Sequence, residues 1–163
     1  LQKKQIMSNY RSTKIYDGFS TCFRQWKAID THCKYLHGYS VSLKVTYEGD
    51  LDGRNWVVDF GRAKRSEVLI DGMNLKDWLN YMLDHTVIMA EDDPSLEEFK
   101  QLNSKGIIQL RVIPAVGAEK FAEYFYHKIN NWVKKDTYDR CRVVSVEVRE
   151  HEKNSAIYEV QEA

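Results

Sequence analysis

Residues 33–47 read CKYLHGYSVSLKVTY, and they contain the clearest strand pattern of the chain. Apolar or aromatic side chains alternate with polar ones along residues 39–47. The apolar set is Tyr39, Val41, Leu43, Val45 and Tyr47. This period of two predicts a strand with one buried and one solvated face. The Glu48-Gly49-Asp50 segment that follows has the residues of a turn.

Working outward from this strand, the pattern changes between strand and helix several times. We predict a short strand at residues 56–58, and a helix that ends at Asp84-His85 and presents Leu75, Trp78, Leu79, Met82 and Leu83 on one face. A short helix follows Ser95, and residues 108–112 form a strand. A long helix then begins after Gly117, and strands at residues 143–150 and 155–160 close the chain. This order predicts an α+β fold, with a mostly antiparallel sheet covered on one face by helices.

Composition narrows the possible classes of function. The 163 residues fit one domain spanning 1–163, in which we expect residues 1–10 to form a flexible N-terminus. Because 24 basic residues balance 24 acidic ones, no overall positive charge favours nucleic acid. No apolar stretch approaches the roughly 20 residues that span a bilayer, and no signal peptide is apparent. Three cysteines without CxxC spacing indicate reduced thiols, so we expect a cytoplasmic protein without nucleic-acid or membrane partners.

Glu150 is a candidate ligand-binding residue. It continues the period of Val144, Val146 and Val148, which would place its carboxylate on the inward strand face. A buried carboxylate needs partners. An internal ion pair is one explanation. The other is a ligand with two adjacent N–H donors, such as the amino-pyrimidinone edge of a pterin or guanine.

Two further groups have reactive side chains, and each also has an ordinary explanation. Asp84-His85 lies at a helix end, where the dipole and the carboxylate favour imidazolium, yet many such histidines are merely solvated. Cys33 and His37 have C-x3-H spacing directly before the clearest strand. Considered alone, Cys33 is typical of an inert buried cysteine and His37 of a hydrogen-bonded structural residue.

Taken in order, these motifs resemble the 6-pyruvoyl/6-carboxytetrahydropterin synthase family. The resemblance rests on Cys33-x3-His37-Gly38, Val58-Asp59-Phe60-Gly61, Leu83-Asp84-His85, the Ala118-Glu119 helix start, Val146-x-Val148-x-Glu150 and Ala156-x-Tyr158. Each motif is weak alone, but the ordered set covers nearly the whole chain. The family implies a tunnelling fold, in which the sheets of several protomers join into an oligomeric β-barrel. A pterin or purine is then bound at the subunit interfaces.

The resemblance also implies an activity and roles for individual residues. Family enzymes are lyases that act on 7,8-dihydroneopterin triphosphate, in pterin biosynthesis or in the queuosine-type 7-deazaguanine pathway. The C-x3-H spacing is more similar to the 6-carboxytetrahydropterin branch. By position, Cys33 would be the catalytic thiolate, Asp84 and His85 the other half of a proton relay, and Glu150 the pterin anchor. Glu119 would assist in substrate binding.

The metal site departs from the family pattern. The resemblance implies zinc held by three histidines, but only His37 is present. Phe23 and Tyr39 occupy the other two positions, and one imidazole with a phenol is a poor zinc site. Cys22 and His32 lie one residue from the expected positions, and on a strand such a shift turns a side chain to the opposite face. Gly117 replaces the threonine of a ligand-contacting turn.

Three functions therefore remain open on the sequence. The first is a synthase-like lyase, a carbon–oxygen or carbon–carbon lyase, that acts on a dihydroneopterin derivative. The second is a zinc-free homologue that binds a pterin or purine without synthase activity. The third is an oligomeric scaffold without a small ligand. Retention of Cys33, Asp84, His85 and Glu150 favours the first, and loss of the two histidines favours the second.

Overall fold

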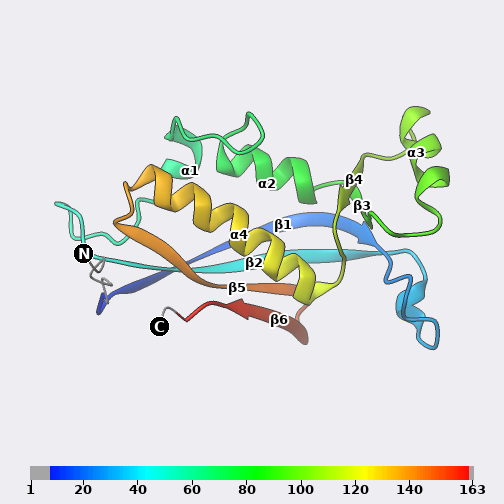
Figure 1. Cartoon of the computed structure of the whole chain (residues 1–163), viewed down its shortest axis with the longest axis horizontal. Coiled ribbons are helices and arrows are strands. Elements are labelled where there is room, and N and C mark those ends of the chain that lie inside the picture. Colours follow the sequence, from blue (N-terminus) through cyan, green and yellow to red (C-terminus); the bar gives the residue numbers. More distant parts are fainter. Residues whose placement is uncertain (1–7, 162–163) are drawn as a thin grey trace, which may run out of the picture.

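A computed structural model describes residues 8–161 as a six-stranded mixed sheet with helices packed on one face (Figure 1). The strands lie in the order β4-β3-β1-β2-β5-β6. Their bounds are β1 Arg11–Phe23, β2 His37–Gly49, β3 Thr86–Ala90, β4 Leu110–Ile113, β5 Cys141–His151 and β6 Asn154–Glu159. The helices are α1 Arg62–Arg65, α2 Leu75–Leu83, α3 Leu96–Ser104 and α4 Ala118–Asp136, with a 3-10 turn η1 at His32–Lys34. The predicted α+β fold is confirmed.

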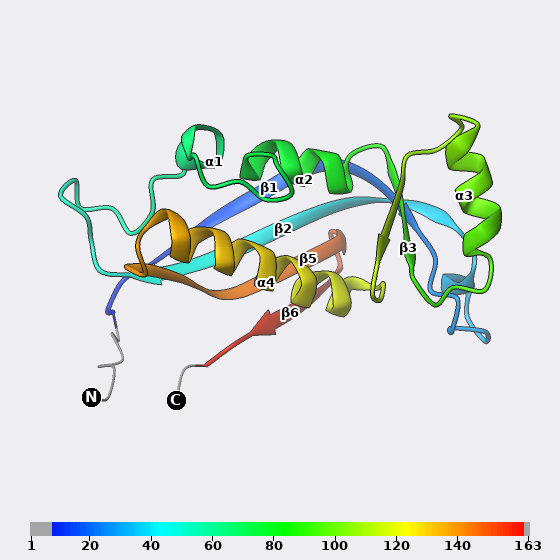
Figure 2. The same cartoon turned by 45° about the horizontal axis from the view of Figure 1, so that its top comes forward.

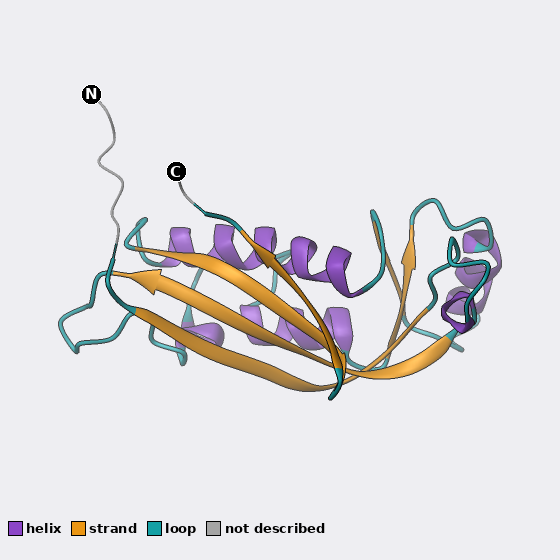
Figure 3. Ribbon diagram, turned by 90° about the horizontal axis from the view of Figure 1, so that it is seen from below, coloured by secondary structure: helices purple, strands orange, loops and turns teal. Residues whose placement is uncertain are grey.

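The core fills the space between the sheet and helices α1, α2 and α4, which lie on the same side of it (Figures 2 and 3). The predicted apolar face of α2 is buried throughout. On α4, the aromatic and aliphatic stripe that includes Phe121, Phe125 and Trp132 is buried as well. Trp78 of α2 packs edge-on against Phe125, with ring centroids 5.4 Å apart. These contacts hold the two helices together over the sheet.

The two long central strands determine where the site forms. β1 and β2 are antiparallel over their full length and pair Thr21 with Tyr39 and Phe23 with His37. β5 continues the sheet beside β2, and a bulge near Val144 changes its register. Because of that bulge Val143, together with Val146 and Val148, reaches the main core cluster, and Val144 does not. From Val146 to Val148 the predicted alternation holds. Glu150 lies at an irregularity of the β5–β6 pairing, and its bond with the Ala118 N–H places it on the helix-covered face.

Three sequence predictions about strands need correction. Residues 56–58 form a loop, in which Val57 and Val58 are buried and the Arg140 guanidinium donates to the Val57 carbonyl at 2.9 Å. β1 was not predicted as a strand beyond its last residues, because its first half is largely exposed and polar. β3 was missed because all five of its residues are buried. It lies between two parallel neighbours, where no polar alternation is expected.

Two further sequence predictions concern the N-terminus and membrane-spanning segments. Residues 1–7 of the predicted flexible N-terminus lie outside the described residues. In the described part of this N-terminal segment, the Ser8 hydroxyl donates to the Gly49 carbonyl at 2.6 Å. No helix in residues 8–161 has the length and apolar character required to span a membrane.

Candidate functional site

At one end of the sheet, three aromatic rings from β1 and β2 are in contact. The Tyr39 ring stacks on the Phe23 ring, with centroids 4.3 Å apart. The Tyr39 ring also contacts the His37 ring, whose centroid lies 4.3 Å from its own. Phe23 is fully buried, and its ring meets the edge of Phe121 from α4 at 4.8 Å. The three positions at which the family resemblance implies zinc ligands are thus adjacent in space. We call Phe23, His37 and Tyr39 the ring cluster.

Cys33 lies in the short η1 turn beside the ring cluster. Its backbone N–H donates to the Thr31 hydroxyl at 3.1 Å, and its carbonyl accepts from the Gln25 N–H at 2.8 Å. These bonds fix the turn to the segment that leaves β1. The thiol is half-buried, and its negative form would lie close enough to Tyr39 to influence that phenol.

The Tyr39 hydroxyl is held in its protonated form. Burial is the main cause that raises the pKa of Tyr39 to about 12, and the nearby Glu150, Cys33 and Cys22 contribute to this rise in that order of importance. At neutral pH the phenol therefore keeps its proton and can donate a hydrogen bond. The same electrostatic contacts place Glu150 and Cys33 around this one phenol.

Glu150 projects toward the beginning of α4. Its carboxylate accepts the backbone N–H of Ala118, and Glu119 lies close by. Partial burial is the main cause of a raised Glu150 pKa, and the Glu119 charge adds to it, while His151, His37 and the Ala118 N–H oppose the rise. No internal ion pair of Glu150 occurs within residues 8–161, so the carboxylate retains acceptor capacity for a ligand.

Asp84 and His85 form a separate pair at the end of α2. His85 Nδ1 lies 3.1 Å from Asp84 Oδ2, and the Ser20 N–H donates to Asp84 Oδ1 at 3.0 Å. The Ser20 N–H is the main cause that lowers the Asp84 pKa, followed by the bond with His85. The His85 side chain is 76% exposed.

The structure brings together most, but not all, of the predicted site. Cys33, His37, Glu119 and Glu150 lie around Tyr39 and the start of α4. In the described part of the chain, the Asp84–His85 pair shares no hydrogen bond or ion pair with Cys33 or Glu150. Within residues 8–161, no direct polar contact therefore joins the two halves of the predicted relay.

The ring cluster does not fit a zinc ion. Phe23 has no donor atom, and Tyr39 resists loss of its proton. His37 directs Nδ1 to the Tyr35 carbonyl at 2.9 Å, which leaves only Nε2 as a free nitrogen. Catalytic zinc usually has three protein ligands. Within residues 8–161 no group of three or more His, Cys, Asp or Glu side chains is arranged to hold a metal ion.

The alternative ligands also fall short. Cys22 pairs with Gly38 on β2 and adjoins Phe23 along a regular stretch of β1, so its side chain lies on the opposite face. His32 is in η1, where its ring lies 6.4 Å from that of Tyr35. Neither residue completes a set with His37.

Sequence reasoning missed the backbone features that shape the site. Gly117 has φ of +113°, and its Cα faces the Gln25 amide. Gly117 directly precedes Ala118, whose N–H is accepted by the Glu150 carboxylate. The available signal was the position of Gly117 immediately before the predicted helix, but its backbone conformation was not predicted.

Comparisons with known proteins agree with this geometry. A model of the 6-pyruvoyl tetrahydropterin synthase family matches residues 13–161. An uncharacterized protein from Wolinella succinogenes has a similar structure, with a TM-score of 0.72 and 19% identity over 93% of this chain and 98% of that one. The 6-pyruvoyl tetrahydropterin synthase of Plasmodium vivax gives a TM-score of 0.62 and 15% identity, over 92% and 98% of the two chains. The Caenorhabditis elegans enzyme gives 0.58 and 18%, over 96% and 100%.

One curated protein matches over a shorter region. The aspartate–tRNA(Asp/Asn) ligase of Beijerinckia indica is 30% identical over 97 residues, which is 58% of this chain. The chain spans only 16% of that ligase, so the match concerns a small part of it. The structural matches, in contrast, extend over nearly the full length of both chains, and they confirm the predicted tunnelling fold.

Proposed function

Because the chain belongs to the 6-pyruvoyl tetrahydropterin synthase family, we propose that it binds a pterin or purine ring at Glu150. The observation that supports this most directly is the half-buried Glu150 carboxylate, which has one bond from the Ala118 N–H and no ion pair within residues 8–161. Two adjacent N–H groups of an amino-pyrimidinone ring would use its remaining acceptor positions. The Tyr39 and His37 rings of the ring cluster provide an aromatic wall against which such a flat ring can pack, with Phe23 buried behind Tyr39.

The proposed reaction is a lyase step on 7,8-dihydroneopterin triphosphate or a related pterin, in pterin or queuosine-type 7-deazaguanine biosynthesis. Cys33 as a thiolate would take a proton from a side-chain carbon of the substrate. The electron pair that is released forms a C=C bond, and the C–O bond to the departing triphosphate breaks. Asp84 and His85 of another subunit of a homo-oligomer would move the remaining proton, because no hydrogen bond or ion pair in residues 8–161 links this pair to Cys33 of the same chain.

A direct assay tests this activity. Purified protein is incubated with 7,8-dihydroneopterin triphosphate, with and without added zinc, and the products are followed by mass spectrometry. We expect release of triphosphate, and loss of that release in Cys33→Ser and His85→Asn. Absence of turnover in both conditions would exclude the synthase-like activity.

The ring cluster favours a second candidate, a zinc-free homologue that binds a pterin or purine without synthase activity. Phe23 and Tyr39 support it, because they replace metal ligands with a carbon ring and a protonated phenol. Metal analysis after dialysis distinguishes the two candidates, since stoichiometric zinc contradicts this one. Thermal shift with pterins and guanine then measures binding independently of turnover.

A further inference from the structure

A second cleft, of about 500 Å³, lies between the first half of β1 and helices α1 and α2. Its cationic and polar lining consists of Lys14, Lys64, Lys76 and Asn80, and Tyr16 and Phe60 add aromatic surface. Lys14 comes from β1, Lys64 from α1 and Lys76 from α2. Glu150 lies on β5, which contributes nothing to this lining, so the lysine cleft is separate from the pterin site.

The three lysines lack the carboxylate partners that neighbouring cations have. On α1, Arg62 pairs with Asp136 at 2.8 Å and Arg65 pairs with Asp59. Lys64 lies between those two arginines in the sequence and has no ion pair within residues 8–161. Neither do Lys14 and Lys76 in that part of the chain. Asp136 and Asp59 are thus already engaged by arginines.

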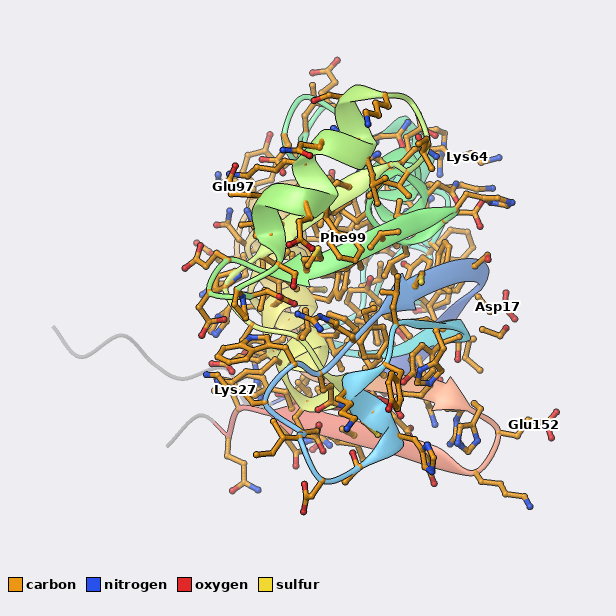
Figure 4. All side chains as sticks on the ribbon, turned by 90° about the vertical axis from the view of Figure 1, so that its right-hand side faces the viewer. Asp17, Lys27, Lys64, Glu97, Phe99 and Glu152 are labelled. Carbon is orange, nitrogen blue, oxygen red and sulfur yellow. The ribbon has the colours of Figure 1, made fainter. Side chains whose placement is uncertain are left out.

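The lysines also lie close enough to affect one another. Contact with Lys64 is the main cause that lowers the pKa of Lys76, and Lys14 contributes in the same direction. The Lys14 ammonium lies 5.8 Å from the Phe60 ring centroid, which places it over the cleft wall. Two carboxylates reduce the positive charge. Asp17 lines the cleft, and Asp77 beside Lys76 is hydrogen-bonded to Asn74. Figure 4 shows Asp17 and Lys64 on the same side of the molecule.

Three clustered ammonium groups with one lining carboxylate leave an excess of positive charge in a concave surface. Like charges at short range repel, and an anion with several charges removes that repulsion from all of them at once. Lysine binds phosphate as a point charge, and the Asn80 amide adds a neutral donor, whereas the Tyr16 hydroxyl is already hydrogen-bonded to the Tyr47 hydroxyl. We propose that the lysine cleft binds the phosphate groups of a polyphosphate anion. This proposal does not depend on pterin binding at Glu150.

The test is calorimetric titration of the full-length protein with inorganic triphosphate at low salt. We expect saturable binding, and a loss of affinity of roughly 10-fold for each of Lys64→Gln and Lys76→Gln. Lys100→Gln is the matched control, because Lys100 lies on α3 and pairs with Glu97 outside the cleft. It should change the affinity less than about 2-fold, as expected for an exposed pair. Far-UV circular dichroism verifies that each variant is folded.

A second titration identifies the source of the phosphate. If the cleft holds the phosphate tail of an organic substrate, 7,8-dihydroneopterin triphosphate binds more tightly than inorganic triphosphate. Lys64→Gln/Lys76→Gln then weakens both, whereas Glu150→Gln weakens only the pterin. If the cleft binds free polyphosphate, the two anions bind equally and Glu150→Gln has no effect. Absence of saturable binding of either anion, or undiminished binding in the double lysine variant, would overturn the proposal.

Discussion

Glu150 is the residue whose ionisation should control ligand binding. Its pKa is raised, chiefly by burial and then by Glu119, so the carboxylate takes up a proton at a higher pH than an ordinary glutamate. Only the ionised form accepts two N–H bonds. We expect the affinity for neopterin, measured by fluorescence titration, to fall as the pH is lowered toward this raised pKa. Glu150→Gln should lose roughly 10- to 100-fold in affinity and show no such pH dependence.

Glu147→Gln is the control for this prediction, because Glu147 lies on the other face of β5 and bonds to Arg149 and Ser155. In Glu150→Gln, the free energy of unfolding should change in the opposite sense to the ligand affinity. A carboxyl group whose pKa is raised in the folded chain stabilises the fold at pH values below the pKa of the unfolded chain. That contribution is lost as the pH rises through the pKa of the folded chain. Glu150→Gln should therefore unfold at a higher urea concentration than the wild type at neutral pH. Equal pH profiles of binding for the two proteins would contradict the role of Glu150.

The ring cluster makes a second prediction at the scale of single residues. Phe23, His37 and Tyr39 are in contact through their rings, so Phe23→His/Tyr39→His places three imidazoles together. We expect this double variant to retain zinc after dialysis, measured by elemental analysis. Without metal it should be destabilised by roughly 2–4 kcal/mol, because a fully buried phenyl ring is replaced by a polar one. Tyr39→His alone is the control, and a metal-free double variant would contradict the prediction.

Among the secondary-structure elements, the beginning of α4 determines the position of Glu150. Gly117 has φ of +113°, which side chains disfavour, and an added Cβ would lie 3.3 Å from Gln25 Oε1. Gly117→Ala should cost roughly 1–2 kcal/mol in urea unfolding and also weaken neopterin binding, since it displaces the Ala118 N–H. Gly53→Ala, with open space around its Cα, is the control. If Gly117→Ala loses stability but keeps its affinity for neopterin, Gly117 does not position the binding site.

The elements that the sequence predicted are those with strong periodicity. The apolar positions from Leu75 to Leu83 predicted α2 to its last residue, and the alternation from Tyr39 to Tyr47 predicted most of β2. β3 has no alternation because both its neighbours are parallel, and β1 was hidden by its exposed first half. Cys33 and Glu150 were predicted as candidate site residues, and their roles stay predictions. Their shared contact with Tyr39 was not predicted, because it depends on the register of three strands.

For the whole molecule, the ends of the sheet are the features that one chain leaves unsatisfied. Among the residues that the structure describes, β6 pairs only with β5, and β1 pairs with β3 only through residues 21–23, so the first half of β1 is an open edge there. Ile157 on β6 is 63% exposed. Exposed strand edges with apolar side chains favour pairing with another chain. Together with the divided relay, these edges support the proposed homo-oligomer.

The edge of β6 allows this assembly to be tested without disturbing the fold. The Val160 N–H donates inward to the Val144 carbonyl at 3.1 Å, and strand N–H groups alternate in direction, so the Ile157 N–H faces away from β5. Ile157→Pro removes only that outward donor and should convert the oligomer to monomer in sedimentation equilibrium, with the far-UV spectrum retained. Tyr158→Pro, which removes an inward donor, should instead destabilise the chain by roughly 3 kcal/mol. A wild-type monomer, or an unchanged mass for Ile157→Pro, would show that β6 is not the interface.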